Sequence, residues 1–174
     1  MRSAYVDESI RGQIYLVCAV IVNDLDIGVV QSRIRTVVLP RRRSHFNSES
    51  DTTREQFLDI LSDLPLEFLL LSMTATKGRA RYVLRRNLLE HLVDHSQASG
   101  IDRLIIEDVS SRIEDVRTIQ RARKRHPPLH FEHRTGATEP LLWAADAVAW
   151  SYGNSREWQA RLSGLKLSHT RLTQ

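Results

Sequence analysis

The chain has 174 residues, of which 41% are hydrophobic and 26% are charged, and this length predicts one domain over residues 1–174 with a substantial core. The longest apolar run, residues 14–22, is about half as long as a membrane span requires, so we expect no membrane partner. Asp7 and Glu8 stand where a signal peptide needs apolar residues, which predicts a cytoplasmic protein.

The net charge is +4, and the positive charge comes almost entirely from arginine, with 22 Arg against 3 Lys. The guanidinium group binds phosphate oxygens with a rigid fork, whereas the lysine ammonium acts as a point charge. This composition favours a nucleic-acid or nucleotide partner. The alternative is the codon bias of a GC-rich genome, which enriches arginine without any binding role.

The chain begins with a predicted β-hairpin, since residues 4–8 and 14–22 favour strands and Gly12 lies in the turn between them. Cys18, the only cysteine, lies inside the second strand and excludes disulfides within the chain and cysteine-rich zinc sites. The elements expected after the hairpin are a helix to about residue 38, a helix from residue 52 or 53 to Pro65, a strand at 66–75, a helix at 79–97, a strand at 103–108, a helix from residue 110 or 111 to about 126, a strand at 129–133, a helix from 138 to about 152, and a short helix with a fraying tail.

Residues 79–97 form the clearest amphipathic pattern, with Leu84, Leu88 and Leu92 repeating every four residues. Arg85 and Arg86 fall largely on the predicted polar side of this helix. The alternation of strands and helices predicts an α/β fold, with a mixed central sheet and helices on both faces.

Asp146 is the only charged residue from Pro140 to Ser155. Its helical neighbours are Leu142 and Trp143 on one side and Trp150 on the other. A carboxylate in such apolar surroundings is costly unless it is paired, hydrogen-bonded or bound to a metal. Asp146 is therefore a candidate site residue, and the alternative is a buried aspartate that caps backbone amides.

Two further pairs of acids lie on predicted strands: Asp7 with Glu8, and Glu107 with Asp108. Successive strand side chains point to opposite faces, so only one acid of each pair can face a given site. Ligands of α/β sheets gather at the carboxyl ends of parallel strands, which is where Glu107 and Asp108 stand. Either of these two can face the site, and both are candidate metal ligands.

Acids on a first strand, a later strand end and a final helix suggest a shared purpose. Three converging carboxylates repel one another unless cations lie between them, and carboxylate oxygens suit Mg²⁺ or Mn²⁺. Two such ions can activate water and stabilise the leaving oxygen in phosphodiester cleavage. The pattern therefore favours metal-dependent phosphodiester chemistry.

Four segments together resemble the bacterial DUF thirty-eight hundred family: the opening Val-Asp-Glu-Ser at residues 6–9, the arginine-preceded His45-Phe46, the strand end Ile106-Glu107, and Glu-Pro-Leu-Leu-Trp-Ala-Ala-Asp-Ala-Val-Ala at residues 139–149. The family's opening continues with glycine, where this chain has Ile10. The family is similar to the ribonuclease H-like nucleases in fold and in the placement of its acids. The resemblance implies a ribonuclease H-like fold with Asp7, Glu107 and Asp146 as metal ligands.

The seven histidines do not indicate a zinc site. His130 and His133 are three apart on a predicted strand and point to opposite faces, while His91 and His95 lack a third ligand. His45 follows three arginines and precedes an aromatic residue, so it could contact a phosphate or carry a proton. The alternative is a loop histidine that is hydrogen-bonded to the backbone.

Two arginine clusters suggest contacts with phosphate. Arg41, Arg42 and Arg43 have no structural explanation and are the candidate phosphate clamp. A second cluster, residues 121–125, lies at a predicted helix C-terminus, where the helix dipole already favours cations.

These features predict a Mg²⁺- or Mn²⁺-dependent nuclease or phosphodiesterase that acts on DNA or RNA, with Asp7, Glu107, Asp146 and His45 as catalytic residues. One alternative is a catalytically inactive relative that binds nucleic acid or a protein partner through the same surface. Another is a small-molecule phosphohydrolase, which would need no flanking arginines. Trp143, Trp150 and Trp158 could exceed the needs of one core and form a homo-oligomer interface.

Overall fold

The computed structural model describes residues 1–37, 46–75, 80–109 and 112–173. Six strands form one mixed sheet in the order β5-β4-β1-β2-β3-β6. The strands are β1 (Arg2–Arg11), β2 (Ile14–Asn23), β3 (Glu67–Thr74), β4 (Arg103–Glu107), β5 (His130–Arg134) and β6 (Leu167–Leu172). The predicted α/β class and mixed sheet are confirmed.

The predicted hairpin is present and forms the centre of the sheet. β1 pairs antiparallel with β2, and Gly12 in the turn has a φ of 58°, a left-handed conformation that glycine adopts without strain. β4 pairs with β1 in parallel, with Val6 opposite Ile106. The acids that follow these two residues are therefore neighbours across the two strands.

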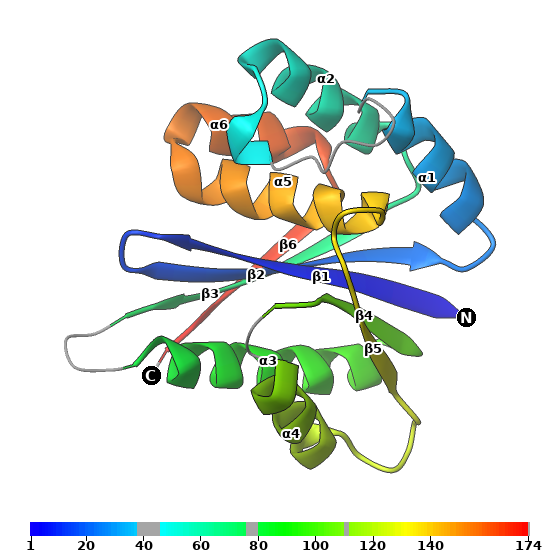
Figure 1. Ribbon diagram of the computed structural model, residues 1–174, viewed down its shortest axis with the longest axis vertical. Coiled ribbons are helices and arrows are strands. Elements are labelled where there is room, and N and C mark those ends of the chain that lie inside the picture. Colours follow the sequence, from blue (N-terminus) through cyan, green and yellow to red (C-terminus); the bar gives the residue numbers. More distant parts are fainter. Residues whose placement is uncertain (38–45, 76–79, 110–111, 174) are drawn as a thin grey trace.

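Helices cover both faces of the sheet (Figure 1). The helices are α1 (Ile27–Arg35), α2 (Asp51–Ser62), α3 (Arg81–Ala98), α4 (Arg112–Ala122), α5 (Pro140–Asn154) and α6 (Arg156–Ala160), with short 3₁₀ turns η1 (Phe46–Ser48) and η2 (Arg161–Gly164). α1, α2, α5 and α6 lie on one face, and α3 and α4 lie on the other. None of the helices in the described ranges combines the length and the apolarity that a membrane crossing requires.

A separate hydrophobic core fills each side of the sheet. Tyr5, Cys18 and Ile105 face α5 and the helices beside it, whereas Val6 and Ile106 face α3. α5 is buried along almost its whole length because it lies directly on β1 and β2. Trp143 and Trp150 are 8% and 3% exposed, so they belong to the chain's own core.

Three sequence predictions of the fold need correction. The tail expected to fray forms the edge strand β6, which pairs in parallel with β3. α4 ends at Ala122, short of the predicted end near residue 126. Arg85, expected on the polar side of its helix, is only 8% exposed. Its position three residues before Leu88 and four before Leu89 places it on the apolar side of α3.

Candidate acidic site between the sheet and α5

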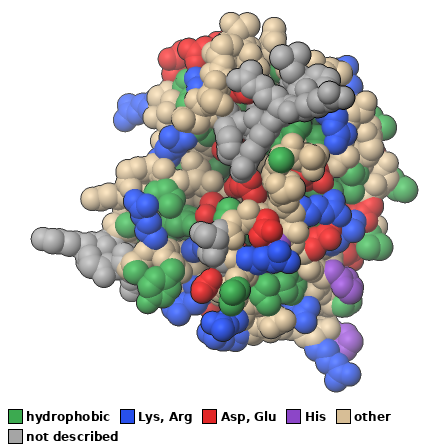
Figure 2. All heavy atoms as spheres, viewed as in Figure 1, with side chains coloured by type: hydrophobic (Ala, Val, Ile, Leu, Met, Phe, Trp, Pro, Cys, Tyr) green, Lys and Arg blue, Asp and Glu red, His purple; other side chains and the backbone are tan. Residues whose placement is uncertain are grey.

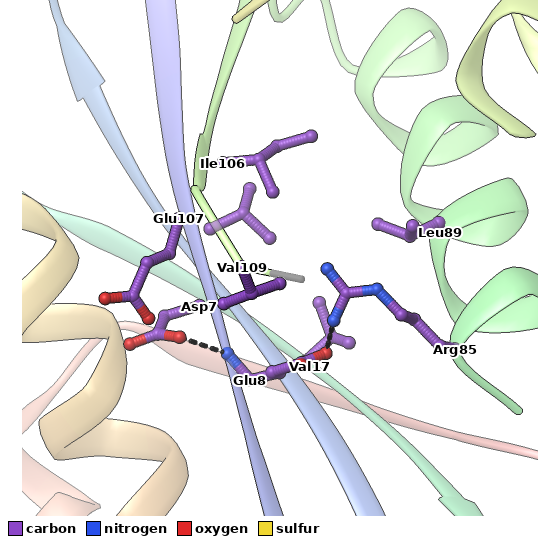
Figure 3. A pocket seen from close by; sticks show the side chains of 9 residues that line it. Asp7, Glu8, Val17, Arg85, Leu89, Ile106, Glu107 and Val109 are labelled. Atoms are coloured by element: carbon purple, nitrogen blue, oxygen red, sulfur yellow. Dashed lines mark hydrogen bonds and ion pairs between the residues drawn. The ribbon is translucent and has the colours of Figure 1, made fainter. Parts of the chain in front are cut away.

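Asp7 and Glu107 lie side by side on the central strands. They directly follow Val6 and Ile106, which are partners in the parallel pairing of β1 with β4. Figure 3 shows both carboxylates extending from the same side of the sheet, away from α3. The pairing of β1 with β4 thus places Asp7, in the middle of β1, beside Glu107 at the carboxyl end of β4, the end of a parallel strand where ligands of α/β sheets bind.

Asp146 lies on α5, the helix that covers the same face. Cys18 is the β2 partner of Asp7, and its thiol pKa is raised by burial first and then by the negative charges of Asp7 and Asp146. Both carboxylates therefore lie near this buried thiol. Asp146 is half-buried among fully buried helix neighbours, so α5 carries its carboxylate into the same layer as Asp7 and Glu107.

Strand alternation separates Glu107 from Asp108, as the sequence predicts for one acid of the pair. Glu107 shares the face of Asp7. Asp108 Oδ2 instead accepts a hydrogen bond from Arg112 at 3.3 Å, and its backbone N–H donates to the Arg134 carbonyl. Glu107 is therefore the acid of this pair that lies with Asp7.

Gly136, in the turn after β5, contacts the carboxylate of Glu107, and the sequence patterns did not single it out. A Cβ atom at Gly136 would overlap Glu107 Oε1, so a larger residue would move the carboxylate. The Gly136 carbonyl accepts a hydrogen bond from Trp143 Nε1 at 2.5 Å, which fixes the turn against α5. The sequence signal that could have identified Gly136 is its place between a predicted strand and the helix that carries Asp146.

The short turn η1 is fastened to α5 beside Asp146. The Phe46 backbone N–H donates to Asp146 Oδ2 at 3.0 Å, and Trp150 Nε1 donates to Asn47 Oδ1 at 2.9 Å. Arg54 donates to the carbonyls of Phe46 and Asn47 and stacks over Trp150, with its Cζ 4.4 Å from the ring centroid. The chain is thus anchored at the acidic site immediately after residue 45.

Four of the predicted site residues, His45 and Arg41, Arg42 and Arg43, lie outside the described residues. Their predicted contacts with phosphate, and the predicted proton transfer by His45, stay predictions.

The other acid of the Asp-Glu-Ser opening, Glu8, belongs to a charged network on the opposite face of β1. Its Oε2 accepts a hydrogen bond from the Tyr15 hydroxyl and forms an ion pair with Arg85. Arg85 also donates two hydrogen bonds to Asp115, at 2.8 and 2.7 Å. His133 Nε2 lies 3.5 Å from the same aspartate. Figure 3 shows Glu8 and Arg85 on the α3 side of β1, opposite Asp7 and Glu107.

The three carboxylates of Asp7, Glu107 and Asp146 are chemically suited to a divalent cation, because Mg²⁺ and Mn²⁺ prefer carboxylate oxygens. Asp7 is 9% exposed, and its Oδ1 accepts the Glu8 backbone N–H at 2.7 Å. Within the described ranges, no three His, Cys, Asp or Glu side chains come close enough together to hold a metal ion. Convergence of the three acids on one metal centre therefore stays a prediction.

Solved structures with the same fold are ribonucleases H. Ribonuclease H2 from Pyrococcus horikoshii OT3 matches with a TM-score of 0.63 and 16% identity, over 94% of this chain and 77% of that chain. RNase HII from Archaeoglobus fulgidus, in a structure of its complex with PCNA, matches with a TM-score of 0.59 and 15% identity, over 95% and 82%. Bst-RNase HIII in complex with Mn²⁺ matches with a TM-score of 0.55 and 16% identity, over 97% of this chain and 57% of that chain.

These similarities confirm the ribonuclease H-like fold that the sequence resemblance implies. A comparison with models of known protein families gives no match, and a comparison with curated protein sequences gives none either.

Proposed function

We propose that this protein is a divalent-metal-dependent nuclease that hydrolyses phosphodiester bonds of DNA or RNA. The observation that carries the proposal is the placement of Asp7 and Glu107 on adjacent parallel strands, with Asp146 facing the same layer from α5, in a ribonuclease H-like fold. The Mn²⁺ complex of the similar RNase HIII supports Mn²⁺ or Mg²⁺ as the cofactor.

In this proposal, Asp7, Glu107 and Asp146 hold the cation. The bound metal would supply an activated water and stabilise the leaving oxygen. Asp108 is the weaker candidate ligand, because it would have to leave Arg112 and cross to the other side of its strand. His45 would carry a proton, and Arg41 to Arg43 would bind the phosphates. The anchoring of Phe46 at Asp146 supports these roles, since it brings the chain to the acids one residue after His45.

The proposal includes the narrower assignments made from the sequence. Membership of the DUF thirty-eight hundred family is supported by the Asp-Glu-Ser opening and by the α5 segment that carries Asp146. A cytoplasmic location also stays a prediction.

The second candidate is an inactive ribonuclease H-like module that binds nucleic acid or a protein partner. It is favoured by one observation, namely that the described residues contain no preassembled group of three metal-binding side chains. Metal binding by the protein in solution distinguishes the two candidates.

The decisive experiment compares wild type with Asp146→Asn in cleavage assays and thermal melts, with and without Mn²⁺. The asparagine side chain retains an oxygen that can accept the Phe46 N–H, so α5 should dock as before. We expect Mn²⁺ to raise the Tm of wild type by mass action, and the variant to gain much less stability and to lose cleavage.

Asp59→Asn is the matched control, because Asp59 is an exposed acid on α2. It should keep both the cleavage and the response to Mn²⁺. If Asp146→Asn lowers the Tm and leaves the gain in Tm with Mn²⁺ unchanged, Asp146 is a structural acid and the nuclease proposal fails.

A further inference from the structure

A groove of about 600 Å³ runs between α3 and α4, on the face of the sheet opposite the carboxylates of Asp7, Glu107 and Asp146. Its walls carry Tyr82 and Arg86 from α3, and Arg117 and Arg121 from α4. Basic, acidic and hydrophobic side chains are interspersed over this part of the molecular surface (Figure 2). The volume is within the usual range of ligand pockets, roughly 300–1,000 Å³.

The groove has a surplus of positive charge. Arg85 at its floor is neutralised by its paired hydrogen bonds to Asp115. Arg117 and Arg121 form no ion pair with any residue in the described ranges, whereas Arg86 pairs with Glu90 at 3.9 Å. Two unpaired arginines therefore face the groove, and Glu114 is the one acid of the lining besides Asp115. The charge complements an anionic ligand.

The spacing of the lining residues fits a chain of phosphates with attached bases. Arg117 and Arg121 are four residues apart on α4, so their side chains emerge one helical turn apart on the same face, with about 5–6 Å between the Cβ atoms. Two guanidinium groups at this spacing can bind successive phosphates of one strand. Tyr82 is 66% exposed, and its ring is available for stacking on a base.

The groove lies on the α3 side of the sheet, whereas the carboxylates of Asp7 and Glu107 extend to the other side. Arg85 and Leu89 line both the groove and a second, small cavity, which is bounded by Asp7 and Glu107. A strand bound in the groove would therefore lie on the opposite face of the sheet from these two carboxylates.

We propose that the α3/α4 groove binds a single-stranded segment of nucleic acid. Arg117 and Arg121 would bind its phosphates, and Tyr82 would stack on a base. The inference rests on the proposed function for the identity of the ligand, because an acidic peptide would satisfy the arginines alone. The exposed tyrosine beside them favours nucleic acid, since every base offers a flat face to an aromatic ring.

The members of the basic cluster at residues 121–125 lie in different surroundings. Arg123 donates to the Leu129 carbonyl and stacks over Phe131, and Lys124 pairs with Asp94. These two cations have structural partners, whereas Arg121 lines the groove. The helix dipole favours Arg121 in the last turn of α4, and its place in the groove lining gives it a second role in this proposal.

The test measures binding of a fluorescent single-stranded DNA of about 15 nucleotides by anisotropy, over a range of salt concentrations and in EDTA so that no cleavage occurs. Arg117→Gln/Arg121→Gln should weaken binding and flatten the plot of log affinity against log salt by about 1.4, or about 0.7 for each lost phosphate contact. Tyr82→Ala should weaken binding by about tenfold and leave the slope unchanged.

Arg156→Gln/Lys166→Gln is the matched control, because it removes the same charge from positions outside the groove lining. It should leave the slope close to that of wild type. An equal change of slope in both double variants would overturn the proposal, since the effect would then be one of net charge. The proposal also fails if wild type binds no oligonucleotide but binds polyglutamate through the groove arginines.

The outcome is distinguishable from that of the nuclease proposal. If the groove variants change the slope while wild type cleaves nothing in Mn²⁺, the groove stands and the catalytic proposal falls. If wild type cleaves nucleic acid in Mn²⁺ and Arg117→Gln/Arg121→Gln leaves the slope unchanged, the catalytic proposal stands and the groove proposal fails.

Discussion

Asp7 and Glu8 are adjacent in sequence and belong to different environments, because β1 sends them to opposite faces of the sheet. Asp7 joins Glu107 in the layer beneath α5, while Glu8 pairs with Arg85 on the other side. The sequence could predict that the two acids separate. It could not identify Arg85 as the partner of Glu8, because that contact joins residues far apart in the chain.

Substitution of Gly136 offers a test of the position of Glu107 that removes none of the carboxylates. The Cβ atom of Gly136→Ala would occupy the site of Glu107 Oε1, the end of a flexible side chain, so the carboxylate should move and the fold should remain. We expect cleavage to fall by up to about a hundredfold, as displacements of about 1 Å can cause. The free energy of unfolding should change by less than about 1 kcal/mol.

The measurements are single-turnover cleavage and urea denaturation of wild type and Gly136→Ala. Gly28→Ala is the control, because a Cβ at this α1 glycine has no atom within 4 Å. Full activity of Gly136→Ala, with an unchanged response to Mn²⁺, would show that the contact with Gly136 does not position Glu107 for metal binding.

At the scale of elements, strongly patterned segments were predictable and the last strand was not. The hairpin, the α3 repeat of leucines and the α5 segment follow from periodicity and from Gly and Pro signals. β6 contains Ser168, His169, Thr170 and Arg171 in succession, and no apolar alternation marks it as a strand. β6 is held in an extended conformation by its pairing with β3. Such a long-range contact leaves no local pattern in the sequence.

His169 connects β6 to its neighbours and should make the docking of this strand sensitive to pH. Nε2 hydrogen-bonds with the Ser72 hydroxyl at 2.8 Å, and Nδ1 with the Tyr152 hydroxyl at 3.0 Å. Burial first, and then the charge of Arg171, lower the pKa of His169 from its ordinary value of 6.5. A lowered pKa means that the unfolded chain takes up the proton more readily. This contribution to stability is therefore fully present above the ordinary pKa and is lost as the pH falls through the folded pKa.

We expect the Tm of wild type to decline between about pH 7 and pH 5, and His169→Gln to decline less, because Gln does not titrate in this range. Thermal melts at several pH values measure the difference. His130→Gln is the control, since His130 lies on β5, at the opposite edge of the sheet from β6. A parallel decline in wild type and His169→Gln would assign the pH dependence to other groups.

A further prediction concerns the arginines that precede η1 in the sequence. It rests on the sequence and on the hydrogen bond that anchors Phe46 to Asp146. Arg41→Ala/Arg42→Ala/Arg43→Ala should weaken binding to nucleic acid and reduce the salt slope by about one unit for each lost phosphate contact. Anisotropy titrations in EDTA measure this slope. Because the groove arginines belong to different elements, the effects of the two sets should add. An unchanged slope would show that the triplet makes no phosphate contact.

At the scale of the whole molecule, the charged network around Arg85 joins β1, β2, α3, α4 and β5 on one side of the sheet. The opposite side is joined by apolar packing of α5 on β1 and β2. Both sides of the sheet have an apolar core, and the α3 side also contains a buried ion-pair network. The apolar packing of α3 and α5 could be predicted from the sequence because hydrophobic periodicity is visible locally, whereas the ion pairs of Arg85 could not.

Removal of Arg85 should destabilise the whole molecule more than removal of any exposed arginine. Arg85→Leu leaves the carboxylates of Asp115, which is 1% exposed, and Glu8 without their cation. An uncompensated buried charge costs about 3–5 kcal/mol, so the urea midpoint should fall accordingly with little change in m. The triple variant Glu8→Gln/Arg85→Leu/Asp115→Asn removes these charges together and should recover part of the loss.

Arg86→Leu is the control, because Arg86 is one residue away and its side chain is 44% exposed. It should change the free energy of unfolding by no more than about 1 kcal/mol. Equal losses for Arg85→Leu and Arg86→Leu would mean that the buried network contributes no more than a surface ion pair.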